Sequence, residues 1–113
     1  MSSRSVQTPL FAMLIDPSRI RVLGPLSSFA AGFADQLAHQ GYTLHSARSQ
    51  MRLMAHLSRW LMAEELGAGD LRTAEVERFP RARRAAGYTR LFSIKAMLPM
   101  LAYLRDLGMA PTP

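Results

Sequence analysis

The feature that most constrains this chain is a series of glycines that divides residues 25–113 into helix-length segments. Gly41, Gly67, Gly87 and Gly108 each follow a stretch in which apolar residues recur every three or four positions. That spacing is typical of an amphipathic α-helix, and glycine often ends one. No segment keeps the alternation of a β-strand, and no internal repeat is visible. The sequence therefore predicts an all-α fold, a small bundle of four to five helices with short connections.

Four helices are expected, with threonine caps at two of their starts. A threonine hydroxyl at an N-cap accepts a hydrogen bond from a backbone N–H that the helix leaves unpaired. The expected bounds are residues 26–40, residues 43–66 capped by Thr43, residues 73–87 capped by Thr73, and residues 89–108. Pro80 and Pro99 fall inside the last two segments. We expect a kink or break at Pro80, and a bend or the start of a new helix at Pro99.

Each predicted helix has an apolar face that a bundle would bury. The expected core residues are Leu26, Phe29, Ala30, Phe33 and Leu37 on the first helix, Leu53, Leu57, Trp60 and Leu61 on the second, and Ile94, Met97, Leu98, Leu101 and Leu104 on the fourth. Residues 1–24 show no sustained periodicity, so we expect an N-terminal arm there and one helical domain over residues 25–108.

Basic and acidic residues are segregated along the sequence. The formal net charge is +6, and no Asp or Glu occurs between residues 36 and 63 or between residues 78 and 105. These two windows hold three and seven Arg or Lys residues, respectively. Such segregation gives the electrostatic field a direction and favours an anionic partner.

The second predicted helix carries three arginines on one face. At about 100° per residue, Arg48, Arg52 and Arg59 fall within about 40° of one another, with His45 and His56 beside them. Like charges at i and i+4 repel, and the acids that would usually be interleaved are missing. A phosphate backbone lying along the ~16 Å between the first and last arginine would supply the neutralisation. A solvated face without a ligand is the alternative.

A second basic cluster surrounds the turn between the third and fourth predicted helices. It comprises Arg78, Arg81, Arg83, Arg84, Arg90 and Lys95. Arg83 and Arg84 near a helix C-terminus also complement the helix dipole, which is an ordinary structural role. Thr89 can present a helix N-terminus to an anion. Lys95 and Ser93 are expected to project outward from the fourth helix as candidate contacts.

Several classes of site lack the residues they would need. The chain has no cysteine, its three histidines have no paired carboxylates nearby, and its neighbouring acids have the pattern of surface charge. We therefore expect no metal site, no cofactor, no small-molecule substrate and no catalytic residue. The longest apolar run, AMLPMLAYL, is shorter than the ~20 residues of a membrane span, and no secretory signal is evident. We expect a bacterial cytoplasmic protein associated with the nucleoid.

Four motifs occur in a fixed order across about 80 residues: FADQLAHQGYT, ARSQMRLMAHLSRWLMAEELG, LRTAEVERFPRARRAAGYTR and YLRDLGMAP. Together they resemble the N-terminal, SAM-like core-binding domain of the tyrosine recombinases, the phage-integrase family. The resemblance implies a helical module that closes over a double-stranded DNA half-site beside other recombinase protomers. It also implies a separate catalytic domain, absent here, with residues 109–113 as the start of its linker. The chain would then be a non-catalytic fragment of a recombinase.

The same resemblance implies which residues face DNA, mainly as phosphate contacts. On the second helix these are Thr43, His45, Arg48, Arg52 and Arg59, and near the fourth helix they are Arg90, Ser93 and Lys95. Arg84 of the basic cluster completes the predicted set. Pro80 departs from the family pattern, and Gln50 is expected to point toward the core.

A helical protein–protein interaction module is the alternative function. It would use the eight methionines, the apolar segment PLFAMLI, and Phe92 and Tyr103, which are expected to point away from the core. The two functions are compatible, because recombinase protomers contact one another.

Overall fold

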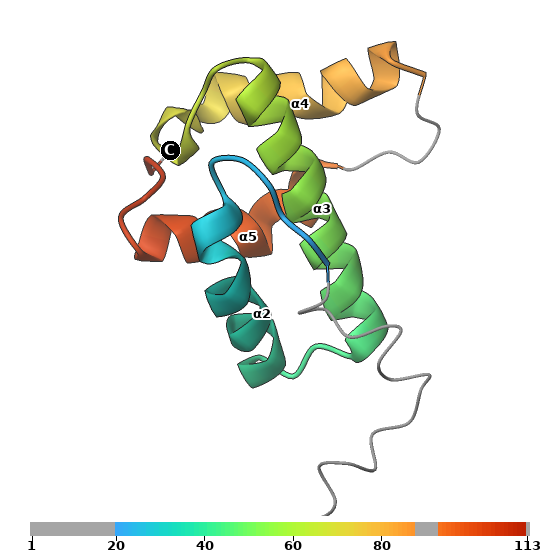
Figure 1. Cartoon of the computed structure of the whole chain (residues 1–113), viewed down its shortest axis with the longest axis vertical. Helices are drawn as coiled ribbons and strands as arrows, with labels where there is room; N and C mark the ends of the chain where they lie inside the picture. The colour runs from blue at the N-terminus through green and yellow to red at the C-terminus, as the bar shows by residue number, and fades with distance from the viewer. Residues whose placement is uncertain (1–19, 88–92, 113) are drawn as a thin grey trace, which may run out of the picture.

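The computed structural model describes residues 20–87 and 93–112, and within these ranges the protein is a small all-α bundle. Its elements are a 3₁₀ turn η3 (Ser27–Phe29), α2 (Ala30–His39), α3 (Leu44–Ala63), a second 3₁₀ turn η4 (Ala68–Asp70), α4 (Thr73–Ala85) and α5 (Ile94–Asp106) (Figure 1). No strand occurs in the described ranges. The predicted fold class is confirmed. Thr89, Arg90, Phe92 and the segment PLFAMLI lie outside the described residues.

The long helix α3 organises the bundle. It packs against α2 and α5, α2 also contacts α5, and α4 contacts α5. In Figure 1, α2 lies beside the first half of α3, while α4 crosses near its other end. The buried apolar residues form one core cluster to which every α-helix contributes. The predicted core faces of α2 and α3 are confirmed, with Phe29, Ala30 and Trp60 partly buried against that cluster.

The start of α3 and the ends of most helices follow the predicted signals. The Thr43 hydroxyl accepts a hydrogen bond from the Ser46 N–H at 3.1 Å. Gly41, Gly87 and Gly108 have positive φ angles directly after α2, α4 and α5. A left-handed residue turns the chain so that the last carbonyls of the helix find N–H donors.

The predicted end of α3 near Leu66 and Gly67 is wrong. The helix ends at Ala63, and Glu65 takes the left-handed conformation with φ 59°. The Leu66 N–H then bonds the Leu61 carbonyl at 2.8 Å, and the Glu65 N–H bonds the Met62 carbonyl at 3.2 Å. This pair of bonds completes a Schellman cap with a glutamate where glycine is usual.

The starts of α4 and α5 also differ from the prediction. Thr73 is the first residue of α4 rather than its cap, which is Arg72 without a side-chain bond. The helix α5 begins at Ile94, not near Thr89, and the Ser93 hydroxyl caps it by accepting the Ala96 N–H at 3.1 Å. Ser93, predicted as a DNA contact, therefore already has a structural role.

Neither proline interrupts its helix, so the expected break at Pro80 and the alternative of a new helix at Pro99 are wrong. α4 continues through Pro80, and α5 continues through Pro99. Proline removes one N–H donor from the helix ladder. In α4 the burial of Val76 and Phe79 fixes the turn before Pro80. Arg83, which follows Pro80 in the same helix, packs over the Phe79 ring, with 6.0 Å between the Arg83 Cζ and the ring centroid.

The predicted core face of α5 is partly wrong. Met97, Leu101 and Leu104 are buried as expected, but so is Met100, while Ile94 and Leu98 are 42% and 49% exposed. The neighbouring helices therefore bury a narrower face of α5 than the apolar residues of its sequence would cover. Of the methionines in the described ranges, Met51, Met54, Met97 and Met100 lie in the core, and Met62 and Met109 do not.

Tyr103 lies on α5 at a close contact with α2, not on a free face as expected. Its ring packs on Phe33 with 5.5 Å between the centroids. A Cβ built on Gly32 would lie 2.0 Å from the Tyr103 hydroxyl oxygen. With the Tyr103 side chain in this position, only glycine fits at position 32.

Ser58 joins the segment before η3 to α3. It is the one fully buried polar residue of the described core. Its hydroxyl accepts the Leu26 N–H at 3.0 Å and donates to the Leu23 carbonyl. Val22 and Leu26 are buried beside this contact. The described part of the expected N-terminal arm, residues 20–24, thus packs on the domain.

Candidate nucleic-acid interface

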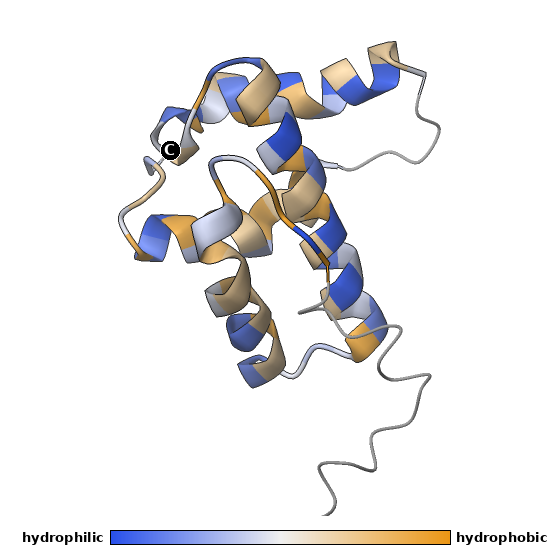
Figure 2. Cartoon of the chain, viewed as in Figure 1, coloured by the Kyte–Doolittle hydropathy of each residue, from blue (hydrophilic) through white to orange (hydrophobic). Residues whose placement is uncertain are grey.

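The arginine face, defined as Arg48, Arg52 and Arg59, lies on one side of α3. Because α3 is a single helix from Leu44 to Ala63, the spacing places the three side chains within about 40° around its axis. Arg52 and Arg59 are exposed, and Arg48 is half-buried. Hydrophilic residues recur along the length of α3 in Figure 2. Most of the buried residues of α3, including Leu57 and Leu61, lie on the other side.

No acid among residues 20–87 and 93–112 pairs with the arginine face. The ion pair between described residues is Arg78 with Glu64, 2.6 Å from Nη2 to Oε1. Arg78 also lies over the Trp60 ring at 5.3 Å, so Glu64 and Trp60 together hold it. The Nε atom of Arg48 is buried and has no hydrogen-bond partner in the described structure.

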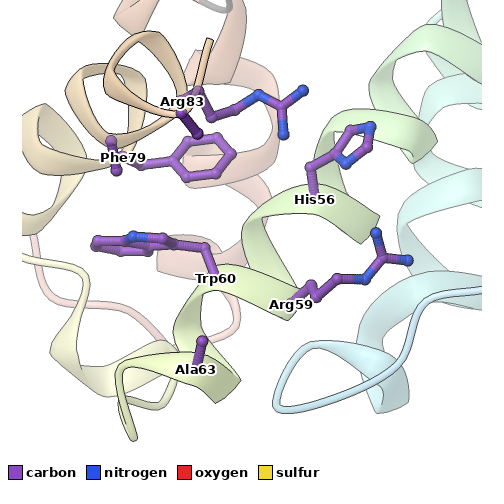
Figure 3. Close-up of a pocket in the computed structure, with 8 residues that line it drawn as sticks. His56, Arg59, Trp60, Ala63, Phe79 and Arg83 are labelled. Atoms are coloured by element: carbon purple, nitrogen blue, oxygen red, sulfur yellow. The ribbon is translucent and has the colours of Figure 1, made fainter. Parts of the chain in front are cut away.

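His56 lies beside the arginine face, on the side toward α4. Burial, together with the positive charges of Arg83, Arg59 and Arg52, lowers the pKa of His56 below the ordinary histidine value. Arg83 belongs to α4 and lines the same pocket as His56 and Arg59, so cationic side chains of two helices lie close together. Figure 3 shows the side chains of Arg83, His56 and Arg59 on one side of a pocket between α3 and α4.

This α3–α4 pocket has an aromatic wall and a cationic rim. Its volume is about 220 Å³. Trp60 and Phe79 form the wall, with ring centroids 5.7 Å apart and planes inclined by 56°. The remaining lining residues are His56, Arg59 and Arg83 on the rim, and Ala63, Ala82 and Ala86 between them. The pocket therefore combines a stacking surface with positive charge.

The other predicted site residues are distributed over the bundle. Thr43 is exposed but caps α3, and His45 is exposed in the first turn of that helix. Arg84 is exposed in the last turn of α4. Lys95 is exposed in the first turn of α5, next to the capping Ser93.

The first turn of α5 meets α3 away from the arginine face. The Gln50 amide donates to the Ala96 carbonyl at 3.0 Å, which confirms that Gln50 points inward. Position 50 lies about 160–180° around α3 from the arginines. No hydrogen bond or ion pair between described residues joins Ser93 or Lys95 to the arginine face.

Arg84, and not Arg83, belongs to the predicted set of DNA contacts. The signal that favours Arg83 is its i, i+4 spacing from the buried Phe79, which places both residues on one face of α4. The expected break at Pro80 hid this relation, because it uncoupled the two halves of the helix.

Comparison of the chain with protein-family models, with curated proteins and with solved structures finds no match. Among the described residues, no group of three or more His, Asp or Glu side chains is arranged to hold a metal ion. None of the described helices combines the length and the apolar character needed to cross a bilayer.

Proposed function

We propose that this chain is a DNA-binding module that contacts double-stranded DNA through the arginine face of α3. The observation that carries the proposal is the set of Arg48, Arg52 and Arg59 on one side of one helix, without an ion pair to any acid of the described structure. Arg83 adds a cation from a second helix. A row of phosphates is the ligand that best complements such a surface.

The contacts would position DNA rather than select a sequence. Guanidinium groups bind phosphate oxygens in any sequence, whereas selection requires contacts to base edges. With four or five phosphates neutralised, log affinity should fall against log salt with a slope of about −4. The isolated module should bind duplex DNA with a Kd of ~10⁻⁴–10⁻⁶ M, the range of non-specific contact.

The resemblance to the core-binding domain of tyrosine recombinases extends this proposal. In that role the chain would hold one half-site while a separate domain performs strand exchange and other protomers bind alongside. In this proposed role the chain is non-catalytic and needs no cofactor.

Fluorescence anisotropy with a labelled blunt duplex at several salt concentrations tests the proposal. We expect Arg52→Glu to weaken binding by at least tenfold and to make the salt slope shallower by one or more units. The matched control is Arg72→Glu, which reverses an exposed arginine at the start of α4. It should weaken binding much less.

Arg48→Glu/Arg52→Glu should abolish binding while circular dichroism shows unchanged helicity. A salt-independent affinity, or equal losses in Arg52→Glu and Arg72→Glu, would reject the arginine face as the binding surface.

A further inference from the structure

The α3–α4 pocket is continuous with the arginine face. Arg59 belongs to both, and His56 lines the pocket one turn after Arg52 on α3 (Figure 3). A phosphate held by Arg59 would therefore lie at the pocket mouth. A group attached to that phosphate could enter the pocket without leaving the interface.

The pocket lining favours a flat, apolar group that carries negative charge at one edge. Trp60 is half-buried, and its indole forms the wall together with Phe79. The alanine side chains of the lining add little bulk to the pocket, and Arg78, which lies over the Trp60 ring at 5.3 Å to its centroid, is not part of the lining. Arg59 and Arg83 supply charge at the rim but no acid lines the pocket, so a cationic group would be repelled.

The size of the pocket restricts its occupant. About 220 Å³ is below the ~300–1,000 Å³ of pockets that hold drug-sized ligands, and it suits a single ring system. A paired and stacked base inside a duplex cannot reach a recessed wall of this kind. An unpaired base at a strand end can, because nothing covers one of its faces.

We propose that the α3–α4 pocket binds one unpaired nucleobase, stacked on Trp60, while Arg59 and Arg83 hold the adjoining phosphate. The inference rests on the proposed DNA-binding function and adds a preference to it. DNA with a single-stranded end should bind more tightly than the same duplex with blunt ends. Base–aromatic stacking is sequence-tolerant, so the preference should extend to any overhang base.

The experiment compares a blunt duplex with the same duplex carrying a short thymidine overhang. One stacked base is expected to tighten binding about tenfold. Trp60 is the only tryptophan of the chain and reports directly on the wall. Its fluorescence should be quenched when the overhang duplex binds, and much less when the blunt duplex binds at equal saturation.

Variants that fill the pocket without changing charge test the location. Ala63→Leu and, independently, Ala82→Leu place a larger side chain on the lining. Both should reduce the overhang preference to less than twofold and leave blunt-duplex affinity and its salt slope unchanged. The matched control is Ala38→Leu at an exposed position of α2, which should retain the full preference.

The outcomes separate this inference from the function on which it rests. Equal, salt-dependent binding of blunt and overhang duplexes would overturn the pocket proposal and leave the DNA-binding proposal intact. Binding of neither duplex would overturn both. An overhang preference that persists in folded Ala63→Leu and Ala82→Leu would place the unpaired base elsewhere and overturn the assignment of the pocket.

Discussion

The contact between α2 and α5 and the junction between α3 and α4 are built in opposite ways. At the first, Gly32 brings the α2 backbone so near that the Tyr103 ring has no spare room. At the second, small alanines and two inclined rings leave a pocket of about 220 Å³. Close packing at the first helps to specify the fold, and the open space with positive charge at the second is where we propose that a ligand binds.

The helix α3 shares in both kinds of construction. Ser58 on its packed side is fully buried and hydrogen-bonded, whereas Arg59, the next residue, is exposed on the arginine face. Successive residues of a helix differ by about 100° in direction, so one element can serve core and surface at once. Substitutions on the two sides should therefore have different consequences.

Gly32→Ala should give the largest loss of stability, because it adds an atom where the structure has no room. The new Cβ would lie 2.0 Å from the Tyr103 hydroxyl, and Phe33 limits the movement of that ring. Overpacking typically costs 1–3 kcal/mol, so an approach as short as 2.0 Å calls for the upper end of that range, and alanine returns ~1 kcal/mol through its helix propensity. We expect a net loss of about 2 kcal/mol in the free energy of urea unfolding.

Adding Tyr103→Phe to Gly32→Ala should restore part of the stability that the glycine substitution removes. With the hydroxyl removed, the nearest ring atom is Cζ at 3.3 Å, a tight but tolerable distance. A coupling energy of about 1 kcal/mol or more is expected in the double-mutant cycle. Gly69→Ala, where the new Cβ has its nearest neighbour at 4.0 Å, is the control and should be close to neutral. Equal effects of both glycine substitutions would show that α2 and α5 are not tightly packed here.

The predictable parts of this fold are those in which a short local pattern decides the structure. The Thr43 cap, the glycine stop at Gly41 and the shared side of the arginine face all depend on residues within a few positions of one another. Hydrogen bonds to free N–H groups, left-handed φ angles and the 3.6-residue turn act at that range.

The parts that sequence analysis missed depend on packing between distant segments. Gly67 offered a better local stop than Glu65, yet Leu66 closes the cap of α3 at Leu61. Arg83 and Trp60 meet at one pocket only because α4 crosses α3. The 3.6-residue period shows which faces are apolar, but it does not show which helix will cover them.

Ser58→Ala should destabilise the packed side of α3 by a smaller amount. It would leave the buried Leu26 N–H and the Leu23 carbonyl without their shared partner. An unsatisfied buried polar group costs about 1–3 kcal/mol, and partial access of water at the exposed Leu23 favours the lower half of that range. We expect the free energy of unfolding in urea to fall by about 1.5 kcal/mol.

The matched control is Ser49→Ala, at an exposed position of α3, which should change stability by less than about 0.5 kcal/mol. A neutral Ser58→Ala would mean that the segment before η3 is held by its apolar side chains alone.

The smallest effect should come from acidifying the α3–α4 junction, where His56 faces Arg52 and Arg59 on its own helix and Arg83 on α4. Burial and these charges lower the pKa of His56 in the folded protein, so the unfolded chain binds a proton more readily. This contribution to stability is complete above the ordinary histidine pKa of about 6.5 and is lost as the pH falls toward the lowered value. His56→Gln removes the titrating group and should make stability less sensitive to pH over that interval. Urea midpoints measured at about pH 7.5 and 5.5 for both proteins test this, because the two proteins differ only at position 56. The same drop in both midpoints would show that His56 does not lie among positive charges.

Bound DNA should change this pH dependence. Phosphates at the junction should favour protonated His56 and so reduce the stability that the wild-type protein loses on acidification. DNA should have no such effect on the close contact between Gly32 and Tyr103, which involves no histidine.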